Sequence, residues 1–307
     1  MSGGGGRRVS DLPVALSHER LPYSKGLMAR ALMGTGLRPE RAYELARLIE
    51  VALLAEQSGE ETTPEQVYDV AAAVLAQHED ETAVRRLRRY QGLQEIERPL
   101  ILLVGGATGT GKSTITTEVA HRLGVTRVTS TDFVRQTMRA FFSEAFMPAI
   151  HYSSFEAGAA TMPDLDPQDA EIRGFLDQTR NVLVGVRAVM ERALTENHSM
   201  ALEGVHLVPG LVPSTLDGAI ISQCVIAISD EELHASHFYV RDADSAGVRP
   251  VEKYLESLPE IRRIQDFLVK RAHEAGVPVI ENRDRDESID AVIRLVLDTF
   301  ERTAGSS

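Results

Sequence analysis

The ten residues GGATGTGKST, at positions 105–114, constrain the fold of this chain more than any other part of its sequence. They fit two different nucleotide-binding loops. The spacing G-x-x-x-G-x-G, which begins at Gly105, is that of short-chain dehydrogenases. The pattern G-x-x-x-x-G-K-[ST], which begins at Gly106 and ends with Lys112 and Ser113, is the Walker A motif, the phosphate-binding loop of ATP- and GTP-using enzymes. The two interpretations predict transfer of a hydride and of a phosphoryl group, respectively.

The residues that follow the glycines favour the phosphate loop. Lys112 is placed to reach the terminal phosphates of a nucleotide and the Ser113 hydroxyl to bind Mg²⁺, whereas a dehydrogenase loop uses neither. A short-chain dehydrogenase also needs a Tyr-x-x-x-Lys pair, and none of the seven tyrosines has a lysine four positions later. The sequence therefore predicts that ATP and Mg²⁺ bind at Gly106, Ala107, Thr108, Gly109, Thr110, Gly111, Lys112, Ser113 and Thr114.

The composition limits the possible partners. A formal net charge of -12 leaves no general basic field, so binding to nucleic acid or to an anionic membrane is disfavoured. A small anionic substrate must then be held by local positive groups. The single cysteine, Cys224, excludes an intrachain disulfide. The chain has no apolar run near the ~20 residues of a membrane span and no secretion signal, so we expect a cytoplasmic protein. The sequence does not determine its oligomeric state.

The amino-terminal third of the chain has a helical pattern. Residues 1–17 are expected to form a flexible tail, and residues 18–92 a small all-helical domain, because apolar residues recur there at three- and four-residue spacings. Thr62 or Thr63 is expected to cap one of its helices, with Pro64 at the first helical position.

The pattern changes in residues 93–307, where short apolar runs alternate with helical segments. This alternation is typical of an α/β fold with a doubly wound parallel sheet, which together with the phosphate loop predicts a P-loop kinase-type domain. Ligands of such sheets bind at the carboxyl ends of the strands. Five strands are expected, in the segments PLILLVGG, TRVTS, HSMALEG, GAIISQCVIAIS and GVPVIEN.

Polar residues at two of these strand ends are candidates for acceptor and metal binding. Asp132 follows the second strand and is placed to accept the proton of an acceptor hydroxyl; alternatively it caps the helix that it opens, alone or behind Thr131. Arg135, one turn later, is placed to hold an acceptor anion. Glu203 ends the third strand, where many phosphate-loop enzymes have an acidic residue that orients Mg²⁺. His206, among apolar residues, is more typical of a structural side chain.

Further candidates lie in two loops and one long helix. Ser153 and Ser154, in HYSSFEAG, are expected either to bind substrate oxygens or to form a turn. In the helix expected over 168–196, Arg180 and Arg187 fall on one stripe with Arg173. That stripe is ~20 Å long, so one or two of its members are expected to meet ligand.

The segment after the fourth strand is where small kinases carry a mobile lid. It contains Arg241 and Arg249, which are expected either to close over the phosphates or to form a solvated basic edge.

The ordered set of these motifs resembles the 2-phosphoglycerate kinase family. The resemblance covers nearly all of residues 8–303 and rests on GGATGTGKST, STDFVRQTMR, HYSSFEAG, ALEGVHL, HFYVR and IRRIQDFLVKRA followed by GVPVIEN. It implies ATP-dependent phosphorylation of 2-phosphoglycerate to 2,3-bisphosphoglycerate. It also implies that Asp132 and Arg135 face the acceptor and that Arg241 belongs to the lid. The helical domain, with PYSKGLMARALMGTG and ERAYELARLIE, looks like the ATP-cone of many family members.

Two other functions remain open from the residues alone. One is a kinase of a different small acceptor, such as a nucleoside or a sugar acid. The other is an ATP-binding regulatory protein with vestigial turnover, although the presence of Lys112, Ser113 and Asp132 argues against it because a sensor does not need all three.

Overall fold

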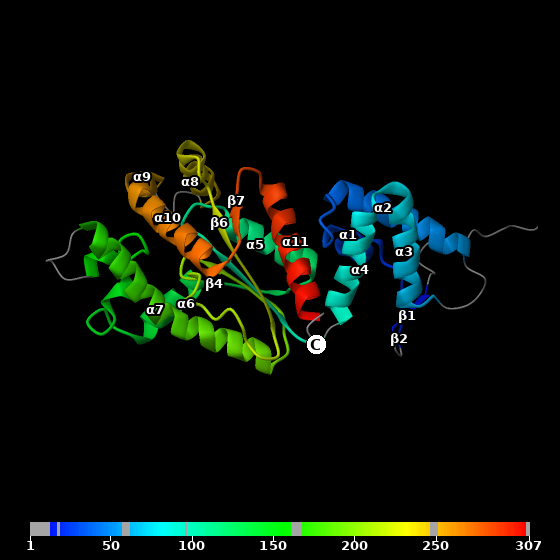
Figure 1. Cartoon of the computed structure of the whole chain (residues 1–307), viewed down its shortest axis with the longest axis horizontal. Helices are drawn as coiled ribbons and strands as arrows, with labels where there is room; N and C mark the ends of the chain where they lie inside the picture. Colours follow the sequence, from blue (N-terminus) through cyan, green and yellow to red (C-terminus); the bar gives the residue numbers. More distant parts are fainter. Residues whose placement is uncertain are drawn as a thin grey trace, which may run out of the picture. The chain divides into compact units, whose positions relative to one another are not determined.

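The chain divides into two compact units (Figure 1). The first is Met1–Ile96 with the short segments Arg122–Gly124 and Phe300–Ser306, and the second is formed mainly by Glu97–His121 and Val125–Thr299. The boundary expected between residues 92 and 93 stays a prediction. The computed structural model describes residues 13–16, 19–56, 62–95, 97–160, 167–245 and 251–304.

The first unit is built mainly from helices. Its elements are β1 (Pro13–Leu16), β2 (Glu19–Pro22), α1 (Lys25–Met33), α2 (Pro39–Glu56), α3 (Pro64–His78) and α4 (Glu81–Glu95). The Thr63 side chain accepts a hydrogen bond from the backbone of Gln66, whose own side chain accepts one from the backbone of Thr63, so α3 begins with a capping box. Strands β1 and β2 pair antiparallel. The sequence patterns did not predict this pair, and the tail expected over 1–17 overlaps β1.

A five-stranded parallel sheet forms the centre of the second unit, as predicted. Its strands are β3 (Leu100–Gly105), β4 (Arg127–Ser130), β5 (Met200–Gly204), β6 (Ile220–Ala227) and β7 (Val279–Glu281). Their order in the sheet is β4-β5-β3-β6-β7. All neighbouring pairs are parallel, with Gly105 opposite Gly204 and Val225. The carboxyl ends of β3, β4 and β5 are therefore adjacent.

Helices cover both faces of this sheet, with α5 and α11 on one side and α6, α7 and α10 on the other (Figure 1). The helical elements are α5 (Lys112–Leu123), α6 (Thr131–Phe141), η2 (Pro148–His151), η3 (Ala157–Ala160), α7 (Pro167–Thr195), α8 (Glu231–Ser245), α9 (Val251–Glu256), α10 (Leu258–Ala275) and α11 (Arg285–Ala304). Ile101 and Leu103 of β3 pack against Val182 and Val186 of α7. Burial on both faces explains why the strands read as nearly continuous apolar runs.

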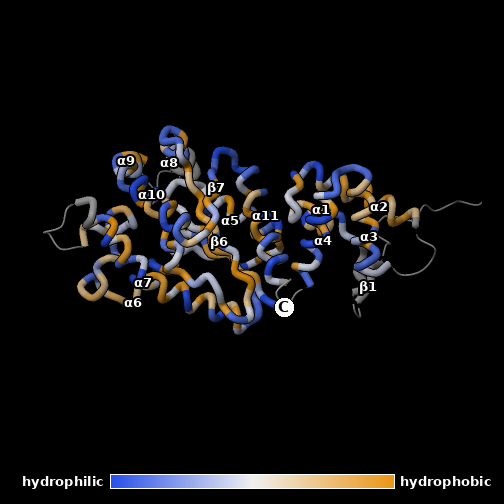
Figure 2. The backbone as a smooth tube through the Cα atoms, in the orientation of Figure 1, coloured by the Kyte–Doolittle hydropathy of each residue, from blue (hydrophilic) through white to orange (hydrophobic). Residues whose placement is uncertain are grey.

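The hydrophobic residues of the second unit follow the strands and the inner faces of the helices (Figure 2). All six residues of β3 are buried.

Among the described helices, none combines the length and the apolar character that crossing a membrane requires.

Candidate functional site

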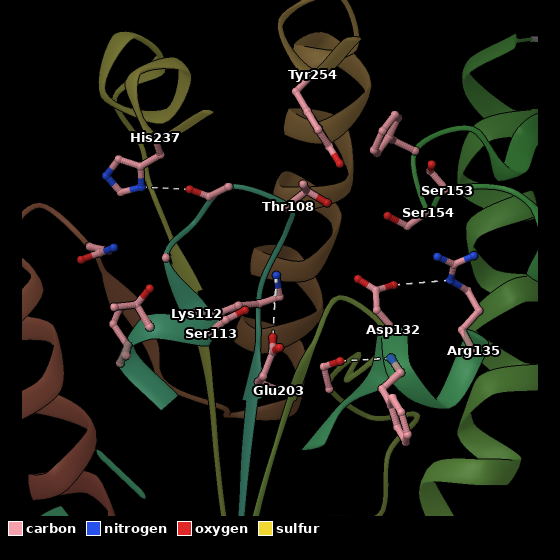
Figure 3. A pocket seen from close by; sticks show the side chains of 18 of the residues that line it. Thr108, Lys112, Ser113, Asp132, Arg135, Ser153, Ser154, Glu203, His237 and Tyr254 are labelled. Atoms are coloured by element: carbon pink, nitrogen blue, oxygen red, sulfur yellow. Dashed lines mark hydrogen bonds and ion pairs between the residues drawn. The ribbon is translucent and has the colours of Figure 1, made fainter. Parts of the chain in front are cut away.

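A pocket of about 960 Å³ opens at the carboxyl ends of β3, β4 and β5 (Figure 3). Small-molecule sites span roughly 300–1,000 Å³, so the pocket has room for two substrates of moderate size. It is lined by Thr108, Gly109, Gly111, Lys112, Ser113, Thr114, Ile115, Ser130, Asp132, Phe133, Arg135, Gln136, Ser153, Ser154, Phe155, Glu203, His237, Tyr254, Asn282, Arg283 and Arg285.

The phosphate loop, residues 105–114, joins β3 to α5 and needs glycine at two crowded positions. Gly109 and Gly111 have φ angles of 86° and 82°, which L side chains rarely adopt. A Cβ on Gly109 would lie 2.6 Å from the ring of Phe238, and one on Gly111 would lie 2.6 Å from the Asn282 amide nitrogen. Glycine thus permits both the turn and the close approach of α8 and of the segment after β7.

Three side chains from distant segments hold the carbonyl groups of this loop. His234 Nε2 donates to the Thr108 carbonyl at 2.8 Å, and His237 Nδ1 donates to the Gly109 carbonyl at 2.9 Å. Asn282 Nδ2 donates to the Thr110 carbonyl at 2.9 Å. With its carbonyls turned toward these donors, the loop can direct N–H groups and the amino terminus of α5 at an anion.

The sequence patterns did not identify these three donors. The histidines are three residues apart in HASH, which places them on one face of a helix, but nothing in that spacing reveals that the face meets the phosphate loop. The amide of Asn282 is one residue beyond β7, which only β6 separates from β3, the strand that the loop follows.

We expect His237→Leu to raise the Kd for ATP about fivefold, because loss of one hydrogen bond of ~1 kcal/mol frees the Gly109 carbonyl to turn toward the phosphates. Titration with ATP in the absence of any acceptor measures this directly. His237→Asn offers an amide N–H near the position of Nδ1 and should retain most of the affinity. Equal losses in both variants would contradict a role for the hydrogen bond.

Lys112 begins α5 and points toward the end of β5 (Figure 3). Its Nζ lies 3.4 Å from the Ala107 carbonyl oxygen and 3.9 Å from Oε2 of Glu203. The side chains of this ion pair are only 12% and 10% exposed. The lysine of the phosphate loop and the acidic residue at the end of β5 therefore lie together with Ser113 at the floor of the pocket.

Asp132 lies in the first turn of α6 without capping it. Ser130 is the N-cap, and its hydroxyl accepts a hydrogen bond from the Phe133 backbone N–H at 3.0 Å. The alternative that Asp132, alone or behind Thr131, caps this helix is wrong. The Asp132 side chain is 62% exposed and faces the pocket from the side opposite the phosphate loop (Figure 3).

Positive groups keep the Asp132 carboxyl ionised. Desolvation alone would raise the pKa of Asp132, but the charges of Lys112 and Arg135 and the hydrogen bond from Arg135 hold this pKa below its usual value. Arg135 Nε lies 3.4 Å from Asp132 Oδ1. Asp132 is therefore an anion at neutral pH and can accept a proton.

Arg135 joins α6 to the segment 148–154, which contains η2 and ends with the two predicted serines. Its Nη1 donates to the carbonyl oxygens of Ile150 and Tyr152, both at 2.9 Å. Ser153 and Ser154 follow directly and line the pocket near Asp132 (Figure 3). Arg135 thus lines the pocket and also anchors its wall.

Two predicted arginines of α7 lie elsewhere. Arg180 and Arg187 are exposed and are not among the described residues that line the pocket. Arg180 Nη1 pairs with Asp177 Oδ1 at 2.8 Å on the helix surface. The side chain of Arg241, in α8, lies outside the described part of the structure, and so does Arg249; their lid role stays a prediction.

His206 follows β5 and is fully buried. The Thr131 hydroxyl lies 2.8 Å from its Nδ1, and Gln178 Oε1 lies 2.8 Å from its Nε2. Both ring nitrogens therefore have partners, as the structural interpretation of this histidine predicted. Burial lowers the pKa of His206 to about 4, so the ring is neutral at physiological pH.

We expect the free energy of unfolding to fall as the pH falls from 6.5 to about 4, because the unfolded chain takes up a proton at His206 in this window and the folded chain does not. The contribution has a slope of at most about 1.4 kcal/mol per pH unit. Urea denaturation across this range, with His206→Gln as comparison, measures it. The variant should show a shallower slope; identical slopes would contradict the assignment. His273→Gln, at an exposed position, is the control.

The pocket also has a basic end that the sequence patterns missed. Arg283 and Arg285, after β7, line it beside the phosphate loop, and their side chains are 78% and 68% exposed. Tyr254 of α9 also lines the pocket; it stacks on Phe238, with ring centroids 5.3 Å apart, and its ring centroid lies 5.9 Å from that of Phe155 in an edge-on arrangement. The pocket therefore runs from these arginines, past Lys112, to the serines.

The residues at the floor of the pocket fit a phosphate-bound Mg²⁺. Mg²⁺ prefers oxygen ligands and keeps several waters, so such a site needs few protein groups. Ser113 and Glu203 supply a hydroxyl and a carboxylate next to the loop. Among the described residues, no cluster of three or more His, Cys, Asp or Glu side chains has the arrangement of an all-protein metal site.

Sequence comparison relates the chain to curated archaeal enzymes named 2-phosphoglycerate kinase. The Methanopyrus kandleri enzyme is 38% identical over 91% of this chain and 85% of its own length. The Methanothermobacter thermautotrophicus enzyme is 37% identical over 91% of each chain, and the Thermococcus kodakarensis enzyme 36% identical over 89% of this chain and 92% of its own.

Other comparisons add little to this relationship. No protein-family model matches the chain. A shikimate kinase from Acinetobacter baumannii is 17% identical and aligns over 68% of this chain and 97% of its own. Its TM-score of 0.36 is too low to support a conclusion.

Proposed function

Since the chain belongs to the 2-phosphoglycerate kinase family, we propose that it transfers a phosphoryl group from ATP to 2-phosphoglycerate and forms 2,3-bisphosphoglycerate. The observation that carries the proposal is the pairing of two groups across one pocket. Lys112 of the phosphate loop lies on one side. The ionised carboxylate of Asp132, which does not cap α6, lies on the other. This arrangement suits a phosphoryl donor beside an acceptor hydroxyl.

The donor nucleotide would occupy the end of the pocket that carries the phosphate loop. The loop N–H groups and the amino terminus of α5 bind its phosphates, and Lys112 neutralises charge on the group that is transferred. Arg283 and Arg285 lie at this end, in long ion pairs of 4.0 Å with Glu281 and 3.7 Å with Asp286 that contacts with phosphate oxygens would replace.

The acceptor would occupy the end of the pocket between Asp132 and the segment 148–154. The hydroxyls of Ser153 and Ser154 and the guanidinium of Arg135 are the polar groups there that suit a carboxylate and a phosphate. Arg180 and Arg187 have no part in this proposal because they lie on the surface of α7.

In the chemical step the free hydroxyl oxygen of the acceptor attacks the terminal phosphorus of ATP. The new oxygen–phosphorus bond forms as the bond to the bridging oxygen breaks and ADP leaves. Asp132 orients the hydroxyl and accepts its proton. Most of the rate enhancement comes from the alignment of the two substrates and from charge neutralisation by Lys112.

Ser113 and Glu203 are the residues that would hold Mg²⁺, and the ion would supply neutralisation of charge on the nucleotide phosphates. In that state Lys112 would exchange its long 3.9 Å contact with Glu203 for contacts with phosphate oxygens.

The test is ADP release from Mg-ATP in the presence of 2-phosphoglycerate, 3-phosphoglycerate, a nucleoside, a sugar acid or no acceptor. We expect stimulation by 2-phosphoglycerate alone, with a bisphosphorylated product seen by phosphorus NMR. Stimulation by another acceptor would retain the kinase and replace its substrate. ATP binding without stimulation by any acceptor would instead support a regulatory protein.

A further inference from the structure

A buried chain of hydrogen bonds runs beneath the acceptor end of the pocket. The Thr131 hydroxyl lies 2.8 Å from His206 Nδ1, and His206 Nε2 lies 2.8 Å from Gln178 Oε1. Gln178 Nε2 donates to the carbonyl oxygens of Ala149 at 2.6 Å and Tyr152 at 3.0 Å. This hydrogen-bond chain through Thr131, His206 and Gln178, called the relay below, joins the start of α6, the segment after β5, the middle of α7 and η2.

The bonds of this relay can run in only one direction. Because the Gln178 amide nitrogen donates to two carbonyls, its Oε1 must accept from His206 Nε2–H. The other ring nitrogen, Nδ1, then accepts from the Thr131 hydroxyl. Thr131, Gln178 and His206 are all fully buried, where hydrogen bonds are strong and a missing partner is costly.

The packing around the relay is close. A Cβ on Gly204 would overlap the Thr131 hydroxyl, so glycine at the end of β5 lets α6 start against the strand. The ring of Phe175, also fully buried, stacks on His206 with centroids 6.3 Å apart. The relay therefore has little freedom to adopt a second geometry.

The two ends of the relay meet residues of the acceptor end. Thr131 directly precedes Asp132, and Tyr152 directly precedes Ser153 and Ser154. The Tyr152 carbonyl also accepts a hydrogen bond from Arg135 Nη1. The segment 148–154 is not part of the sheet, so its position relative to Asp132 is set by these side-chain bonds together with the packing of its buried residues Ala149 and Ile150.

We propose that Thr131, His206 and Gln178 are positioning residues that hold the segment 148–154 against Asp132 and so set the affinity for the acceptor. None of the three is among the described residues that line the pocket, so they act through Asp132, Ser153 and Ser154. The identity of the acceptor rests on the proposed function, whereas the positioning role does not.

The test compares three isosteric or conservative variants. Thr131→Val removes the hydroxyl with little change of shape, and Thr131→Ser retains it. Thr179→Val is the matched control: Thr179 is fully buried in α7, and its hydroxyl has no hydrogen-bond partner within the described structure. Steady-state kinetics give the KM for 2-phosphoglycerate, titration gives the Kd for ATP, and amide hydrogen exchange reports the protection of residues 148–154.

We expect Thr131→Val to raise the KM for 2-phosphoglycerate about tenfold and to lower exchange protection in 148–154, with the Kd for ATP unchanged. Thr131→Ser and Thr179→Val should resemble the parent protein in all three measurements. An equal loss of ATP affinity in Thr131→Val, or unchanged protection of 148–154, would overturn the proposal.

Two features of the design separate a failure of this proposal from a failure of the proposed function and from a variant that does not fold. Hydrogen exchange needs no substrate, so a parent protein that does not respond to 2-phosphoglycerate would reject the proposed function and still allow the relay to be tested. If Thr131→Val does not fold, Gln178→Met removes the donors to Ala149 and Tyr152 at the other end of the relay and should give the same pattern.

Discussion

Lys112→Ala is expected to lower kcat by about 10³-fold, because removing one preorganised donor from a site of developing negative charge typically costs ~10²–10³ in rate. Lys112 is the one charged residue of the phosphate loop, and its ammonium lies between the Ala107 carbonyl and Glu203 at the floor of the pocket. The measurement is the rate of ADP formation at saturating Mg-ATP with 2-phosphoglycerate.

The variant is expected to fold. The contacts of the Lys112 ammonium are a 3.4 Å approach to the Ala107 carbonyl and a 3.9 Å ion pair with Glu203, and both are long. Lys270→Ala removes the same charge from the exposed surface of α10 and should keep full activity. Substantial turnover by Lys112→Ala, with a normal thermal transition, would refute the assignment of the phosphate loop.

Asp132→Asn is expected to lower kcat by about 10²–10⁴-fold, which is the usual contribution of a positioned general base. The amide has nearly the same shape but cannot accept the proton of the acceptor hydroxyl. ATP affinity should change little because Asp132 lies across the pocket from the phosphate loop (Figure 3). Stability should also change little, because Ser130 and not Asp132 caps α6.

Asp177→Asn is a matched control for this substitution. Asp177 pairs with Arg180 three residues later, as Asp132 pairs with Arg135, and the two carboxylates are 58% and 62% exposed. Asp177 is not among the described residues that line the pocket. A similar loss of kcat in both variants would indicate a general effect of charge and not a catalytic carboxylate.

The strands, the phosphate loop and the acidic residues at two strand ends were predictable because each depends on a short segment. A strand covered on both faces is nearly all apolar, and a loop that turns sharply around an anion needs glycine at fixed positions, as at Gly109 and Gly111. Asp132 and Glu203 were predictable for a related reason: parallel strands deliver the residues that follow them to one edge of the sheet.

The sequence patterns were least informative about side chains whose direction depends on packing. Gln178 and Arg180 are two residues apart on α7, which separates them by about 200° around the helix axis. Gln178 is buried and holds the segment 148–154, whereas Arg180 lies on the surface. The heptad spacing of the arginines correctly placed them on one stripe but did not show that this stripe faces away from the pocket.

The sequence by itself determined the α/β class of residues 93–307, the phosphate loop and the strand ends that carry Asp132 and Glu203, because local backbone requirements encode them. Only the tertiary structure decided which side chains hold the phosphate loop and the segment 148–154. His234, His237 and Asn282 lie more than a hundred residues from the loop carbonyls that they bind. Such contacts follow from the order of the strands and the rotation of the helices packed on them, and these arise only when distant segments bury their apolar faces together.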